Sequence, residues 1–277
     1  MDTCGGKEGR RIGEGGDLLN HEVNGVRLHY DEHGRGVPLV ALHGAAVDHG
    51  DIAAAIEDVI PKSGYRRIYP DLPGMGHSSS DGLTSNDDVV SVLIEFIEHV
   101  GAQPVMLVGH SYGAYLARGV AARRPDLALG LALLCPIGQQ THDVPDQQVV
   151  RQDDDAYDEL DAAQRAKFDE YFVVRTAANA RRFRDHTWTG ITLIDEEAIG
   201  RIFAGWTVDV GSSTFSAPAL IVAGRRDSVV GYADAMSLSE RYPRATLAVI
   251  DDAGHALMHE RPEPLGALVS DWLARLR

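Results

Sequence analysis

Short, mostly apolar runs that alternate with stretches of helical spacing limit most strongly what this chain can fold into. The strand-like runs are 38–42, 67–70, 105–108, 131–134, 219–223 and 246–250. The helix candidates are 51–60, 85–100, 112–124 and 263–277. Continuous apolar runs suit strands that are buried on both faces, and their alternation with helices is typical of a parallel sheet. The pattern therefore predicts an α/β fold.

Two segments depart from this alternation. The Asn24-Gly25 pair precedes the alternating run 26–30 and predicts an antiparallel hairpin at the start of the sheet. Residues 138–216 contain no convincing strand and carry helical stretches at 158–174 and 176–186. Counting the hairpin as two strands, we expect a mostly parallel eight-stranded sheet flanked by helices, with a helical insertion after the sixth strand.

These patterns divide the chain into a tail, a core and an insertion. Residues 1–19 are rich in Gly, Glu, Arg and Asp without any period, which predicts a flexible N-terminal tail. The core is expected at 20–137 and 217–277, and the insertion at 138–216.

Cys4 and Cys135 lie too far apart to suggest a disulfide framework, so we interpret them as a tail thiol and a core thiol.

Charge and hydropathy exclude several classes of partner. The formal net charge of −15 disfavours nucleic acid and anionic membranes, because both are polyanions. The start of the chain lacks the apolar stretch of a secretory signal, and no run approaches the ~20 apolar residues that cross a bilayer. We therefore expect a soluble cytoplasmic protein that acts on a small molecule, with a homodimer as the assembly left open.

A Gly-x-Ser-x-Gly pentapeptide at 109–113 stands between a predicted strand and a predicted helix. A serine hydroxyl is a poor nucleophile unless it projects from the backbone and meets a base. A sharp strand-to-helix turn gives Ser111 that position, and Gly109 and Gly113 lack the Cβ atoms that would collide there. Ser111 is therefore the predicted nucleophile, and an ordinary turn is the alternative.

The predicted base and acid follow the last two strand-like runs. His255 comes after 246–250, where a loop can hold its ring beside Ser111. Asp227 comes after 219–223 and is the candidate that orients the imidazole, with a simple turn aspartate as the alternative. Asp251 and Asp252 are rivals, but they adjoin the histidine in sequence and are poorly placed to reach its far nitrogen.

A second histidine near the C-terminus raises the question of a metal. His259 follows His255 by four residues, a spacing found in zinc enzymes, but no Glu follows His255 and no third ligand is evident. We therefore expect His259 at a helix start or on the surface. The prediction is an enzyme with no metal and no cofactor.

The end of the first parallel strand supplies a candidate oxyanion hole. The sequence there is Leu42-His43-Gly44-Ala45, and the backbone amide of Ala45 can act together with that of Tyr112. Two aimed donors stabilise a tetrahedral oxyanion, and the loss of one such donor costs roughly 3–4 kcal/mol. His43 is interpreted as a structural hydrogen-bonding residue beneath this loop.

These motifs resemble the α/β-hydrolase superfamily over nearly the whole chain. They are His43-Gly44-Ala45, the loop Asp-Leu-Pro-Gly-Met-Gly-His-Ser at 71–78, the elbow at 109–113, and Gly254-His255. The order serine, aspartate, histidine is also the order of this superfamily. The resemblance implies that residues 138–216 form a helical cap over the active site. Half of the chain's 18 aromatic residues fall in that segment, as expected for a mostly apolar pocket.

The resemblance leaves the substrate open. Epoxide hydrolases and haloalkane dehalogenases are similar in fold but place an aspartate where this chain has Ser111. The chain also resembles esterases, which favours cleavage of an ester, thioester or lactone of a small apolar substrate through an acyl-enzyme. It further resembles meta-cleavage-product hydrolases, which cleave a carbon–carbon bond of a vinylogous diketone. Those enzymes commonly carry Ser-Met where this chain has Ser111-Tyr112.

Three further readings are kept as alternatives. An aminopeptidase of the proline-iminopeptidase type would need cap carboxylates at a substrate amine, for which Asp153–Asp155 or Glu159 are candidates. An acyl-transfer or cyclising enzyme would use the same Ser111 with a nucleophile other than water. A ligand receptor would bind a small molecule in the same pocket without turnover.

Overall fold

The computed structural model describes residues 19–138, 140–210 and 214–276. The predicted flexible tail, with Cys4, lies outside these residues except for Leu19, which begins the first strand. An eight-stranded sheet has the order β1-β2-β4-β3-β5-β6-β9-β10. Its strands are β1 (Leu19–Val23), β2 (Val26–Gly34), β3 (Gly36–Leu42), β4 (Gly64–Pro70), β5 (Val105–His110), β6 (Ala128–Leu134), β9 (Ala219–Gly224) and β10 (Ala245–Ile250).

The sheet is antiparallel only at one edge. β2 pairs antiparallel with β1 and with β4, and each remaining neighbouring pair is parallel. The Asn24–Gly25 turn that joins β1 to β2 has positive φ at both residues, as a two-residue hairpin turn requires. These observations confirm the predicted mostly parallel eight-stranded sheet.

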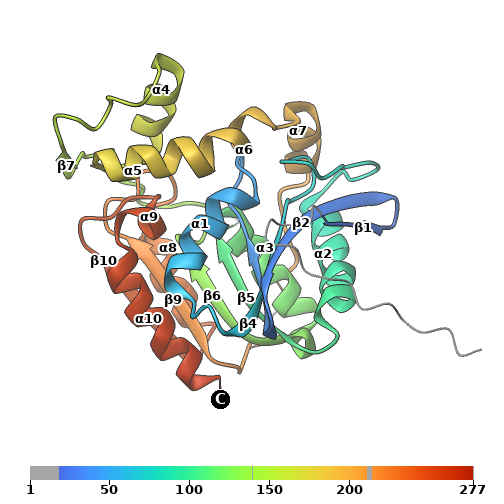
Figure 1. Cartoon of the computed structure of the whole chain (residues 1–277). Coiled ribbons are helices and arrows are strands. Elements are labelled where there is room, and N and C mark those ends of the chain that lie inside the picture. Colours follow the sequence, from blue (N-terminus) through green and yellow to red (C-terminus); the bar gives the residue numbers. More distant parts are fainter. Residues whose placement is uncertain (1–18, 139, 211–213, 277) are drawn as a thin grey trace, which may run out of the picture.

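Helices cover both faces of the sheet (Figure 1). They are α1 (His49–Val59), α2 (Asn86–Gly101), α3 (Tyr112–Arg123), α8 (Ala233–Ser239), α9 (Leu257–Glu260) and α10 (Pro262–Arg275). In β3, Val40 and Leu42 belong to the core with α2 and α3, whereas Leu39 and Ala41 belong to the core with α1 and α10. Strand residues alternate between faces, so two covered faces explain why this strand is apolar without interruption.

The start of α2 shows how the sequence marks a helix boundary. The Ser85 hydroxyl accepts a hydrogen bond from the amide of Asp88 at 3.2 Å, and Asp87 and Asp88 place negative charge in the first turn. Both features stabilise a helix N-terminus. Among the described residues, no helix combines the length and the apolar character needed to cross a membrane.

The β6–β9 segment (residues 135–218) lies across one end of the sheet (Figure 1). Its elements are β7 (Arg151–Gln152), α4 (Ala162–Tyr171), β8 (Val174–Arg175), α5 (Ala177–Arg182), the π-helix η2 (Phe183–Thr187), α6 (Trp188–Thr192) and α7 (Glu196–Ala204). The expectation of a segment without strands misses the short parallel pair β7–β8. Phe168, Phe172 and Phe183 form a small core of their own that packs on Ala256, next to His255.

Candidate active site

Ser111 occupies the turn between β5 and α3. Its φ of 52° and ψ of −114° place it in a region that residues with a side chain rarely adopt. Such a conformation costs about 1–3 kcal/mol and persists only where the surroundings impose it. Here the Ser111 amide donates to the Leu134 carbonyl at 2.9 Å, which fixes the turn to the neighbouring strand β6.

The two flanking glycines allow this turn to pack against other backbone. A Cβ atom on Gly109 would lie 2.5 Å from the carbonyl carbon and oxygen of Gly113. A Cβ atom on Gly113 would lie 2.2 Å from the Leu42 carbonyl oxygen at the end of β3. Both distances are far below any van der Waals contact, so only glycine fits at either position.

Gly113→Ala is therefore expected to destabilise the fold by about 3 kcal/mol or more, because the new methyl group meets main-chain atoms that cannot move aside. Urea unfolding followed by circular dichroism measures the change. Gly266→Ala is the matched control, since a Cβ atom there has Val59 Cγ1 at 3.7 Å as its nearest neighbour. That control should leave stability unchanged or raise it by ~0.5–1 kcal/mol. Equal stability of the two variants would contradict this account of the elbow.

Asp227 and His255 come together from the loops after β9 and β10. The His255 Nδ1–H donates to Asp227 Oδ2 at 2.8 Å. The other carboxylate oxygen of Asp227 accepts from the amides of Val229 and Val230 at 2.9 and 3.0 Å. Burial alone would raise the pKa of Asp227, but the contact with His255 and the two amides lowers it below its ordinary value. With the proton on Nδ1, the Nε2 atom of His255 keeps a lone pair that can accept a proton.

Ser111 and His255 line the same cavity, which has a volume of about 670 Å³. The core contributes Gly44, Ala45, Ala46, Val47, His110, Ser111, Val229 and His255. The β6–β9 segment contributes Lys167, Glu170, Tyr171, Phe183, Thr187, Ile191, Ile194, Glu196, Ile199 and Gly200. The predicted nucleophile and base thus face a mostly apolar cavity, open to solvent, that both parts of the chain build.

The loop after β3 brings Ala45 to this cavity, and His43 lies beneath it. His43 is fully buried, its Nδ1–H donates to the Gly44 carbonyl at 2.7 Å, and its Nε2 accepts from the Leu72 amide at 2.9 Å. Both ring nitrogens are therefore used to hold loops in place. Tyr112 begins α3 directly after Ser111, and its hydroxyl donates to the Asn86 side chain at 2.7 Å.

His110 is a residue of the site that sequence reasoning missed. Its Nε2–H donates to the main-chain carbonyl of His255 at 3.0 Å, and its ring lies 4.8 Å from that of His255. Burial lowers the pKa of His110 to about 3, so the ring is neutral. It supports the loop of the predicted base from the strand before the elbow. It occupies one of the two variable positions of Gly-x-Ser-x-Gly, so the motif gave no signal for it.

His259 was expected at a helix start or on the surface. It lies in a short helix, but the expectation of a surface position is wrong. His259 lies within α9, its side chain is wholly buried, and its Nε2–H donates to Asp51 Oδ1 at 3.1 Å. The same oxygen accepts from the Thr187 hydroxyl at 2.7 Å. Burial raises the pKa of Asp51, but the contact with His259 lowers it to about 2. This buried pair joins α1, α9 and η2.

Glu260 connects the loop of His255 to the β6–β9 segment. One carboxylate oxygen accepts from the Gly254 amide at 2.7 Å. The other accepts from the amides of Val173 and Val174 at 2.6 and 2.9 Å. Burial raises the pKa of Glu260. A glutamate three residues before a predicted helix gave no sequence signal for this bridge.

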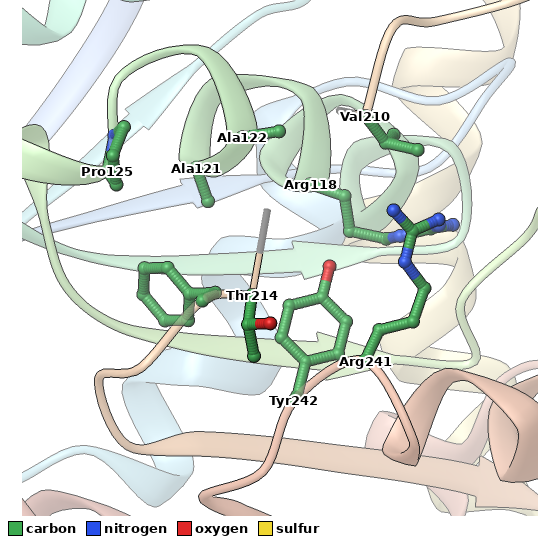
Figure 2. Close-up of a pocket in the computed structure, with 9 residues that line it drawn as sticks. Arg118, Ala121, Ala122, Pro125, Val210, Thr214, Arg241 and Tyr242 are labelled. Atoms are coloured by element: carbon green, nitrogen blue, oxygen red, sulfur yellow. The ribbon is translucent and has the colours of Figure 1, made fainter. Parts of the chain in front are cut away.

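A second and smaller pocket, of about 70 Å³, lies between α3 and the chain around Arg241 (Figure 2). It is lined by Arg118, Ala121, Ala122, Pro125, Val210, Thr214, Phe215, Arg241 and Tyr242. Among the described residues, this set shares no member with the cavity at Ser111. The predicted chemistry therefore belongs to the larger cavity.

The comparisons with known proteins agree with this fold. The Alpha/beta hydrolase family matches the chain over residues 39–268. In the solved structures, an alpha/beta superfamily hydrolase from Oenococcus oeni has a TM-score of 0.82 and 27% identity, and covers 90% of this chain and 96% of its own.

Three curated relatives are similar over most of their length. The (E)-2-((N-methylformamido)methylene)succinate hydrolase of Acinetobacter baylyi is 26% identical over 90% of this chain and 95% of its own. The 2-hydroxymuconate semialdehyde hydrolase of Pseudomonas putida is 24% identical over 90% and 92%. The pimeloyl-[acyl-carrier protein] methyl ester esterase of Xanthomonas campestris is 29% identical over 83% and 92%. The chain is thus similar to hydrolases whose named substrates differ.

Proposed function

Because the chain belongs to the alpha/beta hydrolase family, we propose that it is a serine hydrolase that cleaves esters, thioesters or lactones of small apolar acids. The observation that carries the proposal is the 2.8 Å bond between His255 and Asp227, in the loop that shares a cavity with Ser111. The family alone supports a hydrolase, whereas this arrangement supports the acyl-enzyme route.

The mechanism follows from the proton positions. Nε2 of His255 accepts the Ser111 proton while the alkoxide forms a bond to the substrate carbonyl carbon, and Asp227 stabilises the imidazolium. The amides of Ala45 and Tyr112 would stabilise the resulting oxyanion. His255 then gives its proton to the leaving oxygen or sulfur. In the second half, water loses a proton to His255 and attacks the acyl carbon; the bond to Ser111 Oγ then breaks, His255 returns the proton to that oxygen, and the acid is released.

The charges around the cavity favour an uncharged acyl group. Among the described lining residues, Lys167 is the only lysine or arginine, and its Nζ is 2.8 Å from the Glu170 carboxylate. Glu196 adds a further carboxylate. A substrate carboxylate in this cavity would meet two carboxylates against one cation that is already paired, which is unfavourable, although water partly screens these charges because the Lys167 and Glu170 side chains are 50% and 64% exposed.

A pair of substrates of equal length tests this proposal. p-Nitrophenyl butyrate and p-nitrophenyl hemisuccinate differ mainly by a terminal carboxylate, which in the hemisuccinate also attacks its own ester to form the cyclic anhydride. Once this rate without the protein is subtracted, the ratio of kcat/KM isolates the effect of charge. We expect the neutral ester to be favoured at least ~10-fold, which corresponds to about 1.4 kcal/mol. Equal rates, or a preference for hemisuccinate, would contradict the assignment of an uncharged substrate. No turnover of either ester, with the fold intact, would contradict the ester hydrolase itself.

Carbon–carbon bond hydrolysis is the second candidate function. It is favoured by the similarity to 2-hydroxymuconate semialdehyde hydrolase over 90% of this chain. The same Ser111 and His255 would serve, with the base giving its proton to a carbon. The ion-paired Lys167 offers little to the carboxylate of a dienoate. Following the loss of colour of a dienoate beside the nitrophenyl esters separates the two, and faster cleavage of the dienoate would favour this candidate.

A further inference from the structure

Three ligand-type side chains meet at a place outside the cavity of Ser111. His29 lies in β2, His49 is the first residue of α1, and Asp71 directly follows β4. One ligand atom from each lies within 4.8 Å of the others. His29 and Asp71 are buried, and the His49 side chain keeps 20% of its surface exposed. The cluster is therefore mostly enclosed but can be reached from solvent at one side.

The imidazole of His29, one of these three side chains, has an unused nitrogen. Its side chain is buried with the residue 2% exposed, and Nε2 has no hydrogen-bond partner. A buried polar atom without a partner costs about 1–3 kcal/mol, so natural structures rarely keep one without a reason. A metal ion would use this nitrogen as a ligand.

The backbone around the cluster is held rigidly. Asp71 Oδ1 accepts from the amide and the Nδ1–H of His49 at 2.9 and 2.7 Å. The Asp71 amide donates to the His29 carbonyl at 2.9 Å. The Ser78 hydroxyl accepts from the His29 amide at 2.9 Å and donates to the Asp71 carbonyl at 2.8 Å. Strand β2, the start of α1 and the loop after β4 thus hold the three side chains in place before any ion binds.

We propose that His29, His49 and Asp71 bind one Zn²⁺ or a similar divalent transition metal ion. Two imidazoles and one carboxylate are a ligand set that suits zinc, with bonds of about 2.0–2.2 Å. Tetrahedral ligands at that distance are about 3.3 Å apart, so an ion would replace the proton that His49 Nδ1 shares with Asp71 Oδ1, widen their 2.7 Å separation, and draw in the His29 ligand atom from within 4.8 Å. The His77 amide donates to Asp71 Oδ2 at 2.8 Å, so an ion would take its third protein ligand from the Oδ1 side and complete its shell with water.

The ion would link three elements that lie far apart in sequence, so its role is structural. An ion that binds only the folded chain stabilises it in proportion to the logarithm of its concentration over Kd. The site contains no thiolate, and imidazole ligands favour zinc, copper or nickel over magnesium and calcium. None of its three residues lines the cavity at Ser111. Ester hydrolysis is therefore expected to proceed whether or not the ion is bound.

Titration of the chelator-treated full-length chain with Zn²⁺ against a chromophoric competitor tests the proposal. We expect one equivalent to bind with a micromolar or lower Kd and to raise Tm. His49→Gln should weaken binding at least ~10-fold and remove the Tm shift, because zinc loses one of three ligands. His142→Gln is the matched control, since His142 also pairs with an aspartate, Asp234, at 3.0 Å but outside such a cluster. It should bind zinc like the unaltered chain.

The Co²⁺-loaded protein identifies the ligand set. Nitrogen and oxygen ligands in a tetrahedral site give visible d–d bands without thiolate-to-cobalt charge transfer. A charge-transfer band together with loss of ester hydrolysis would place the ion at His110, Cys135 and His255, whose ligand atoms also lie within 4.8 Å of one another. That outcome would overturn the proposal, as would undiminished zinc binding by His49→Gln or no binding by the unaltered chain. Undiminished zinc binding by His49→Gln, or no binding by the unaltered chain, would leave the proposed ester hydrolysis standing.

Discussion

Replacement of Ser111 by alanine should lower kcat/KM for p-nitrophenyl butyrate at least ~10³-fold, because no other group in the elbow can form the acyl-enzyme. The fold should survive, since alanine removes one buried oxygen and keeps the Cβ atom that the turn already accommodates at a φ of 52°. Steady-state kinetics and a thermal unfolding scan measure the two effects separately.

Ser270→Ala is the control for this substitution. Ser270 is an exposed serine of α10, and its hydroxyl donates to the Gly266 carbonyl at 2.8 Å. Its removal should leave kcat/KM unchanged. Retention of more than a few per cent of the activity by Ser111→Ala would reject Ser111 as the nucleophile. A fluorophosphonate probe should label the unaltered chain and the control, and fail to label Ser111→Ala.

Asp227→Asn should reduce kcat by about 10³–10⁴-fold while leaving KM little changed. The amides of Val229 and Val230 both donate to one side of Asp227, so they would hold the carbonyl oxygen of the new asparagine there. The NH₂ group of the asparagine must then face His255 Nδ1. Nδ1 can accept this hydrogen bond only if it carries a lone pair and no proton. The imidazole proton moves to Nε2, where it can no longer act as a base toward Ser111.

Asp234→Asn is the matched control, because Asp234 pairs with His142 at 3.0 Å on the surface. It should have activity equal to the unaltered chain. The ring protons of His255 can be followed by NMR, which reports the tautomer directly. A loss of activity without a change of tautomer would contradict the argument from the two amides, and full activity would exclude Asp227 from the mechanism.

The sequence predicted the sheet and its elbow because both have local causes. An apolar run such as 105–108 identifies a strand buried on both faces, and the glycines at 109 and 113 mark a turn that other residues cannot make. Chain order then indicated which loops carry an acid and a base. The bond between Asp227 and His255 agrees with that reasoning, although their roles in catalysis stay predictions until the variants are measured.

The polar residues that hold the site in place could not be predicted in the same way. Asp51 and His259 are 208 residues apart, and their pairing depends on how α1 and α9 pack. A single aspartate in a helix looks like any solvated charge when its burial is unknown. His110 and Glu260 act through main-chain groups of the loop around His255, and main-chain acceptors and donors leave no pattern in the sequence.

The carboxylate of Glu260 has a consequence for how substrate enters. It bonds Gly254, next to His255, to Val173 and Val174 of the β6–β9 segment, so the segment that lines part of the cavity is joined to the loop of the predicted base. If the chain around Val173 and Val174 moved away from the core, it would either break these hydrogen bonds or displace the imidazole of His255 from Ser111. Substrate entry and correct alignment of the predicted base would then occur at different times. While the cavity is opened in this way, His255 would be misaligned for proton transfer from water.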